Sequence, residues 1–191
     1  MKNLEPTVVN GPVTDAERTY AIDLLKTTQD GLRQSLAGLN SEQLSFKPSA
    51  DRWSIAECVE HIALVEKGIF RAVQAGLNAP ADPDRRSTIE VSDVFVIKAV
   101  RSRSSSLPAP VPFMPTGRFG DAQTALAAFN QQRDAAIDFV QTVQEDLRTH
   151  YFVHYVMGTL DAYQAVLLMA AHAERHRKQI EEVKTSPGFP Q

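Results

Sequence analysis

The sequence is poor in cysteine and glycine, and it has no large excess of either charge. Its 191 residues include a single cysteine, Cys58, and only nine glycines. One cysteine cannot form a disulfide within its own chain, so a disulfide scaffold is excluded and a reducing compartment fits best. The few glycines argue against a glycine-rich nucleotide-binding fold. With 20 basic and 23 acidic residues the net charge is −3, which argues against a general nucleic-acid-binding protein.

Long apolar runs are also missing. The longest, such as residues 165–171, are much shorter than the roughly 20 apolar residues that cross a membrane. The N-terminus, MKNLEPTVVNGP, lacks the apolar core of a secretory signal peptide. We therefore expect a cytoplasmic protein with no membrane and no nucleic-acid partner. Its length and its 43% apolar content predict one domain over residues 14–185, with an N-terminal arm at 1–13 and a C-terminal tail at 186–191.

What the sequence does contain is helical periodicity. Four segments place apolar residues three and four positions apart, which predicts four long amphipathic helices. Capping-box patterns start the first two segments, Thr14 with Glu17 and Ser54 with Glu57. The first helix should end near Gly38, because glycine readily adopts the positive φ that terminates a helix.

The boundaries of the later helices follow from the same signals. The second helix should run to about Leu77, and Asp121 should start the third, whose apolar positions continue to Leu147. Thr159 can cap a fourth helix that runs to about Lys184. No internal repeat and no alternating strand pattern is present. The predicted fold class is therefore all-α, a four-helix bundle.

The segment between the second and third predicted helices, residues 78–119, is unusually long. It contains a short helical pattern over residues 88–101 and then a stretch, 104–115, whose prolines exclude a helix. Long structured loops of this kind often cover functional sites. A lid over a site and a plain crossover between two helices are equally good interpretations of this segment.

Two histidines in the fourth predicted helix, His172 and His176, lie four residues apart. This spacing puts both imidazoles on one face of the helix, where a single metal ion could bind both. They fall in the apolar stripe and should face the bundle interior, where imidazoles without partners are costly. His61 borders the apolar stripe of the second helix and could be a third ligand. Spacing alone favours equally a metal site and a set of core histidines satisfied by hydrogen bonds.

Two segments resemble the signatures of a known family. Residues 53–62, WSIAECVEHI, look like the second-helix signature of the DinB/YfiT-like superfamily, and residues 172–180, HAERHRKQI, resemble its fourth-helix signature. The resemblance spans about residues 14–184. It implies a four-helix bundle, often dimeric, in which three histidines hold a divalent metal, commonly nickel or zinc. By position, the metal ligands in this sequence would be His61, His172 and His176.

The resemblance implies a metal site more firmly than it implies any one reaction. Some relatives transfer low-molecular-weight thiols to electrophiles, and others are regarded as metal-dependent hydrolases. Three imidazoles would leave a tetrahedral metal one open position, which is the pattern of catalytic sites. We therefore expect a metal-dependent transferase, working as a homodimer on a small-molecule substrate with a thiol. A metal-dependent hydrolase and a non-catalytic metal- or ligand-binding bundle are the alternatives.

Several polar residues near the candidate ligands have simpler explanations. Glu57 is explained by its capping box, although it could also orient His61. Cys58 should be a small core residue rather than a ligand or a reactive thiol, with Trp53 packed on it as a hydrophobic staple. Arg133 interrupts an apolar stripe, and snorkelling or an internal ion pair explains it at least as well as contact with an anionic substrate.

The remaining candidates should belong to the surface or to the packing. We expect solvent-exposed positions for the charged residues beside the ligands, which are Glu60, Glu174, Arg175, Arg177 and Lys178. His150 and His154 should be packing or rim residues, with a place in the pocket as the alternative. Tyr163 should lie in the core, and Arg101 and Arg103 could belong to a lid.

Overall fold

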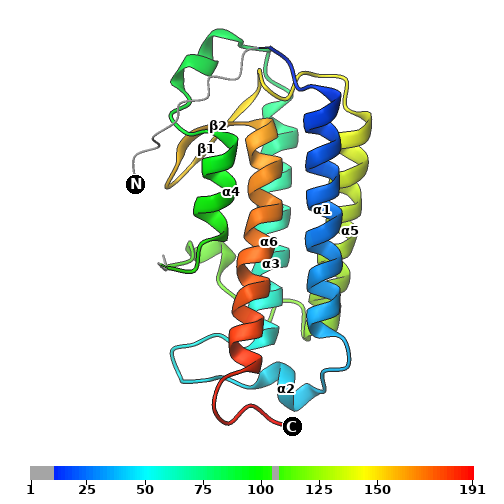
Figure 1. Ribbon diagram of the computed structural model, residues 1–191, viewed down its shortest axis with the longest axis vertical. Helices are drawn as coiled ribbons and strands as arrows, with labels where there is room; N and C mark the ends of the chain where they lie inside the picture. Colours follow the sequence, from blue (N-terminus) through cyan, green and yellow to red (C-terminus); the bar gives the residue numbers. More distant parts are fainter. Residues whose placement is uncertain (1–10, 105–107) are drawn as a thin grey trace.

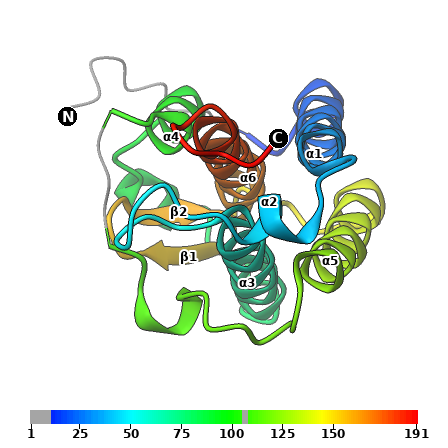
Figure 2. The ribbon, with the colours of Figure 1, turned by 90° about the horizontal axis from the view of Figure 1, so that it is seen from below.

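The main feature of the computed structural model, which describes residues 11–104 and 108–191, is a bundle of four long helices (Figure 1). These are α1 (Asp15–Leu36), α3 (Ile55–Gly76), α5 (Ala122–Thr142) and α6 (Ala162–Lys184). Seen end-on, each helix contacts two neighbours, in the order α1, α6, α3, α5 and back to α1 (Figure 2). The predicted all-α four-helix bundle is confirmed.

The directions of the helices explain the long crossover. Helices α1 and α6 run one way along the bundle, and α3 and α5 run the other way (Figure 1). Because α3 and α5 point in the same direction, the chain between them has to return along the whole bundle. This crossover contains η1 (Asp84–Thr88), α4 (Asp93–Arg101) and η2 (Val111–Phe113), and α4 packs on α6. The short helix expected at 88–101 is thus present from Asp93, after its N-cap Ser92.

Two boundaries predicted from the sequence are wrong. Helix α5 ends at Thr142, although Leu147 beyond it is fully buried, so burial continues without helical geometry. Thr159 does not cap α6 but lies in β2 (Gly158–Asp161), which pairs antiparallel with β1 (Tyr151–His154). Asp161 caps α6 instead, because its side chain accepts a hydrogen bond from the backbone N–H of Gln164 at 2.7 Å. A short helix, α2 (Ser41–Ser45), completes the described elements.

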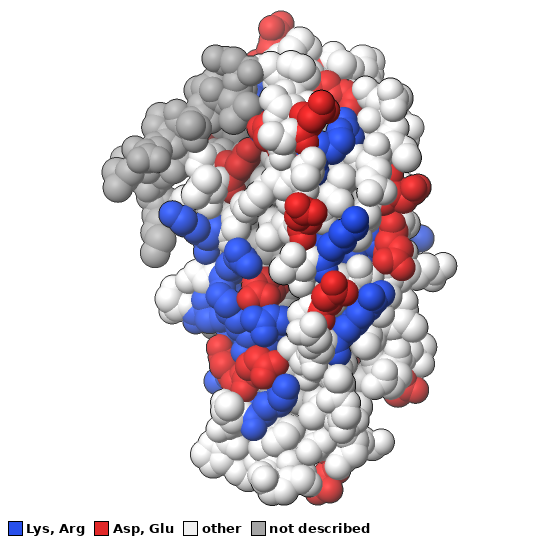
Figure 3. All heavy atoms as spheres, turned by 45° about the vertical axis from the view of Figure 1, so that its right-hand side comes forward, with Lys and Arg blue, Asp and Glu red and all other residues white. Residues whose placement is uncertain are grey.

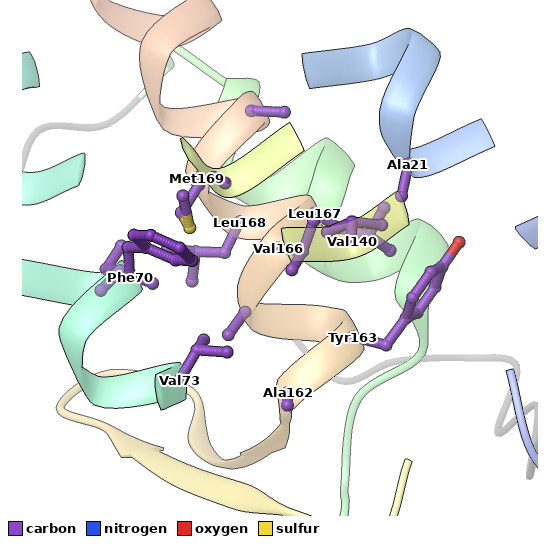
Figure 4. Packing of buried hydrophobic residues seen from close by; sticks show 14 of the residues in the cluster. Ala21, Phe70, Val73, Val140, Ala162, Tyr163, Val166, Leu167, Leu168 and Met169 are labelled. Carbon is purple, nitrogen blue, oxygen red and sulfur yellow. The ribbon is translucent and has the colours of Figure 1, made fainter. Parts of the chain in front are cut away.

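The apolar core fills the bundle in two clusters. In the half near the hairpin, Phe70 and Val73 of α3 lie beside Leu168 and Met169 of α6 (Figure 4). The other half, near α2, packs around Phe129 of α5. Fully burying a side chain of this size contributes about 1.5–3 kcal/mol, so these contacts dominate the stability of the bundle.

A buried ion pair links all four long helices. Arg133 of α5 is fully buried and donates to both carboxylate oxygens of Glu66 on α3, at 2.6 and 2.9 Å. The same guanidinium donates to the Leu25 carbonyl and the Thr28 hydroxyl of α1, and at 3.5 Å to the Met169 carbonyl of α6. Of the interpretations open for Arg133 from the sequence, the structure shows the internal ion pair.

A second buried network holds the crossover at the end of the bundle near the hairpin. Arg148 is only 1% exposed and donates to Asp93 at the start of α4, to Asp161 and to Glu17 of α1, at 2.6–3.2 Å. Arg148 also lies over the ring of Tyr163, which is buried as expected. The sequence pattern gave no indication of this network.

Most of the predicted N-terminal arm, residues 1–10, lies outside the described part of the structure. Beyond α6, the ring of Phe189 packs edge-on against Phe46, with centroids 5.6 Å apart. None of the helices in the described part is long and apolar enough to cross a membrane.

Candidate metal centre

The structure brings together the three histidines that the sequence singles out. His61 comes from α3, and His172 and His176 come from successive turns of α6. Each offers one ring nitrogen, and these three atoms all lie within 4.8 Å of one another. His61 Nε2 and His172 Nε2 are 3.2 Å apart. A four-residue repeat on α6 and its packing against antiparallel α3 are sufficient to build this cluster.

Hydrogen bonds fix the tautomers of two of the rings. His61 Nδ1 lies 2.7 Å from the Phe113 carbonyl oxygen, and His176 Nδ1 lies 2.9 Å from Gln179 Oε1. A carbonyl oxygen can only accept, so each Nδ1 has to carry the proton and each Nε2 keeps its lone pair. Metal-binding histidines are typically held in this way, with the second ring nitrogen donating to a carbonyl.

The three histidines have too few N–H donors to satisfy one another by hydrogen bonding. With His61 and His176 both bare at Nε2, only His172 could donate a proton within the cluster. This proton could form a hydrogen bond with one Nε2 lone pair only, whereas a metal cation could be coordinated by all three imidazoles. Metal–nitrogen bonds of about 2.0–2.1 Å at a tetrahedral centre place two ligand nitrogens about 3.3 Å apart. The observed 3.2 Å between the Nε2 atoms of His61 and His172 is close to that value.

Burial keeps the three rings neutral. It lowers the pKa of His61, even though the hydrogen bond to Phe113 opposes the change. Burial, and then the neighbouring imidazoles, hold the pKa of His172 well below its usual range. The pKa of His176 is lowered well below its usual range by burial first and by His61 second. Neutral imidazoles are the form that binds a metal, so the site is ready to act as a ligand set at neutral pH.

Trp53 forms an aromatic wall beside this cluster. Its ring centroid lies 4.8 Å from that of His61 and 6.0 Å from that of His176. It also packs on the apolar cluster that contains Cys58, the partner expected from its position before the N-cap Ser54. The role of Trp53 beside the imidazoles was not evident from the sequence.

The crossover covers the outer side of α3 next to the site. Glu60 is only 6% exposed and accepts hydrogen bonds from the backbone N–H groups of Thr116, Gly117 and Arg118 at 2.9–3.0 Å. Burial alone would raise the pKa of Glu60, but these donors lower it. The prediction that Glu60 is solvent-exposed is therefore wrong, because residues 111–118 pack over this side of the helix.

The other charged neighbours are more engaged than predicted. Glu174 is buried, with 9% exposure, and is paired with Arg177 at 2.7 Å, so the expectation of an exposed carboxylate is wrong there too. Arg175 and Arg177 are half-buried, and only Lys178 is exposed as expected. On the face drawn in Figure 3, Lys and Arg side chains gather at mid-height with Asp and Glu side chains between them. Mixed charge of this kind indicates ion pairing more than a uniform basic surface.

The side chains of two further candidates, Cys58 and Glu57, are engaged in structural roles. Cys58 is completely buried, and burial raises the pKa of its thiol to about 12, which confirms it as a core residue. Glu57 accepts from the backbone N–H of Ser54 at 2.8 Å and pairs with Lys47 at 2.7 Å, as its capping role requires.

His150 and His154 do not join the three-histidine cluster. His150 is buried and donates from Nδ1 to the Asp146 carbonyl at 3.1 Å, so it is a packing residue. His154 ends β1, where its Nδ1 accepts from the backbone N–H groups of residues 156 and 157 at 3.2 Å.

The fold and the site thus define a helical-bundle protein with a potential three-histidine metal centre. Residues 24–180 match the DinB superfamily, and the chain belongs to that superfamily. A curated relative, the uncharacterised protein YuaE of Bacillus subtilis strain 168, is 23% identical over 150 residues, covering 78% of this chain and 88% of YuaE.

A solved structure has the same fold. YfiT from Bacillus subtilis superposes with a TM-score of 0.63 at 15% identity, covering 95% of this chain and 94% of YfiT. YfiT has been described as "a probable metal-dependent hydrolase with an unusual four-helix bundle topology". At this level of identity the likeness establishes the shared fold alone.

Proposed function

We propose that this protein is a divalent-metal-dependent enzyme whose metal is held by His61, His172 and His176. The observation that carries the proposal is the convergence of three neutral imidazoles, two of them fixed with Nε2 as the free atom. Three imidazoles suit zinc or nickel and leave a position for a substrate. The description of YfiT as a probable metal-dependent hydrolase supports the same interpretation.

The surrounding residues favour a nucleophile that comes from outside the protein. A divalent metal in this site would lower the pKa of a bound thiol or water and polarise an electrophile. In the described part of the structure, the thiol of Cys58 cannot act as this nucleophile, because it is buried and its pKa is raised to about 12. The nearby carboxylates of Glu57, Glu60 and Glu174 are each occupied by other contacts.

We therefore infer transfer of a low-molecular-weight thiol to an electrophilic carbon. The thiol proton leaves to solvent, the sulfur bonds to the carbon, and the leaving group departs with the electrons of the bond that breaks. Trp53 would line the apolar side of the bound substrate, and the buried rings of His61 and His176 would help to exclude bulk water. Hydrolysis is the second candidate, and the description of YfiT as a probable hydrolase favours it. The lone cysteine supports a cytoplasmic location, and the family resemblance supports a homodimer.

The first measurement is the metal content of protein purified without a metal-affinity tag, beside a His172→Ala variant. His150→Ala is the matched control, because it removes a buried histidine outside the cluster. We expect about one equivalent of zinc or nickel in the wild type and in the control, and none in His172→Ala. No metal in the wild type after reconstitution with either ion would overturn the proposal.

Turnover then separates the two reactions. 1-Chloro-2,4-dinitrobenzene with a small thiol tests transfer, and p-nitrophenyl acetate without thiol tests hydrolysis. Metal-dependent and thiol-dependent product supports the transferase, whereas metal-dependent product without thiol supports the hydrolase. A loaded protein inactive on a panel of thiols, electrophiles and esters would overturn the catalytic part and leave a metal-binding bundle.

A further inference from the structure

The crossover reaches the candidate metal centre through a hydrogen-bonded chain that ends on His176. Gln179 is buried, with 8% exposure, and its Oε1 accepts from His176 Nδ1 at 2.9 Å. The same oxygen accepts from Arg103 at 3.2 Å. Arg103 lies just after α4, 76 residues before Gln179 in sequence, so this contact ties the crossover to α6.

Arg103 is itself held in one orientation. Its Nε and one terminal nitrogen donate to the two carboxylate oxygens of Glu182, at 3.0 and 2.6 Å. This bidentate pair leaves the other terminal nitrogen directed at Gln179. Two donors, from Arg103 and His176, then converge on one amide oxygen, which fixes the orientation of the Gln179 amide and the tautomer of His176.

The crossover supports His61 in a parallel way. The Phe113 carbonyl accepts from His61 Nδ1, and Glu60 holds the next residues of the crossover through three backbone N–H groups. The Phe113 ring lies so close to α3 that a Cβ on Gly68 would approach it to 2.6 Å. Glycine at position 68 thus permits the close approach that brings the Phe113 carbonyl to His61.

We propose that Arg103 and Gln179 are positioning residues of the metal centre, and that Arg103 and residues 111–118 of the crossover form its outer layer. The Phe113 carbonyl sets the His61 ring, and the Arg103–Gln179 pair sets the His176 ring. The proposal rests on the proposed function only in its metal-binding part. Coupling between two sites is reciprocal, so a metal on the three imidazoles should also hold the crossover more firmly against α3 and α6.

Tautomers measured in metal-free protein test the first part without any metal. Long-range ¹H–¹⁵N NMR of the histidine rings should show the Nδ1–H form for His61 and His176 in the wild type. In Gln179→Leu, His176 should lose this fixed tautomer while His61 keeps it. An Nε2–H form of His176 in the wild type would overturn the positioning role.

Affinity tests the second part. Gln179→Leu removes the acceptor, whereas Gln179→Glu keeps an oxygen for both donors, and Gln131→Leu changes an exposed glutamine of α5 as a control. By competition with a chromophoric chelator, zinc should bind Gln179→Leu about 10–100-fold more weakly, the usual effect of losing such a partner. Gln131→Leu should bind as the wild type does, and Gln179→Glu, which keeps an acceptor for His176, should lose much less affinity than Gln179→Leu. Equal affinity of Gln179→Leu and wild type would overturn the positioning role alone.

Hydrogen exchange tests the reciprocal coupling. Zinc should slow amide exchange at Thr116, Gly117 and Arg118 in the wild type but not in His172→Ala. Arg103→Met should reduce this protection, because it separates the crossover from Gln179. Exchange that zinc leaves unchanged in the wild type, under conditions where zinc binds, would overturn the coupling. A wild type that binds no zinc would instead overturn the proposed function, whatever the tautomers show.

Discussion

Replacing Glu66 by glutamine should destabilise the protein by about 3–5 kcal/mol, because it leaves the fully buried guanidinium of Arg133 without its counter-charge. The two hydrogen bonds between the side chains measure 2.6 and 2.9 Å, and each bond to a charged group contributes about 1.5–3 kcal/mol. A glutamine amide offers one acceptor in place of two and turns its NH2 group toward another donor. The Leu25 carbonyl and the Thr28 hydroxyl compensate only in part, since they remain bound to Arg133 in both proteins.

Urea unfolding followed by circular dichroism measures this free energy directly. Asp30→Asn is the control, because its pair with Arg33 is exposed and 3.5 Å long, so it should change the free energy of unfolding by less than about 1 kcal/mol. The double variant Glu66→Leu with Arg133→Met removes both charges and should be more stable than Glu66→Gln. The reasoning is refuted if Glu66→Gln lowers the free energy of unfolding by no more than Asp30→Asn does. It is also refuted if the double variant loses as much free energy of unfolding as the single variants Glu66→Leu and Arg133→Met lose together.

Three further predictions concern the crossover, the thiol and the hairpin. The pKa of Glu60 is lowered in the folded protein, so Glu60 contributes stability above its unfolded-state pKa, and this stability is lost as the pH falls through its folded-state pKa. Amide exchange at residues 116–118, corrected for the intrinsic rate, should therefore accelerate in acid. The same exchange should respond less to pH in Glu60→Gln. Iodoacetamide at pH 8 should label Cys58 only after unfolding in urea, since burial raises the pKa of the thiol to about 12; rapid labelling of native protein would contradict this. Gly158 has φ +73° and open space around its Cα, so Gly158→Ala should lower the free energy of unfolding by about 1–2 kcal/mol, measured by thermal melting, and an unchanged melting temperature would count against it.

Most of the fold could be predicted from patterns among residues that are close together in the sequence. The capping boxes at Thr14 and Ser54 are formed as expected, because the residues that make each one are three positions apart. The boundary at Leu147 failed for a physical reason: Leu147 is buried in the same core as the end of α5, and apolar spacing cannot distinguish a helix from a packed turn. Thr159 failed as a cap because the β1–β2 pairing, which is not local, places the start of α6 at Asp161.

The candidate site shows the same division between local and distant partners. His172 and His176 are recognisable from their spacing, whereas His61 joins them across 111 residues through the packing of α3 on α6. The contacts of the crossover could not be predicted from spacing or from helix packing, because Phe113 is 52 residues from His61 and Arg103 is 79 residues from Glu182. One signal was available in the sequence.

That signal is Gly68, in the middle of a long amphipathic helix. A glycine there weakens the helix by about 1 kcal/mol relative to alanine, so a packing reason is expected for it. The reason is the ring of Phe113, which occupies the space where a Cβ would lie. Read in this way, Gly68 marks the turn of α3 against which the crossover packs, two turns beyond His61.

Burial and hydrogen bonding have different effects on the cluster: burial keeps the imidazoles neutral, and the hydrogen bonds to Nδ1 orient them. Burial removes the protons that would block metal binding, and the carbonyl partners at Phe113 and Gln179 then keep the remaining proton on Nδ1. Without those two acceptors, either ring could turn its N–H toward the cluster and satisfy the others by hydrogen bonding. The acceptors therefore favour the metal-binding form over a closed hydrogen-bonded core, and one of the two comes from the crossover. In this bundle the long connection between α3 and α5 is a component of the candidate site as well as a link between helices.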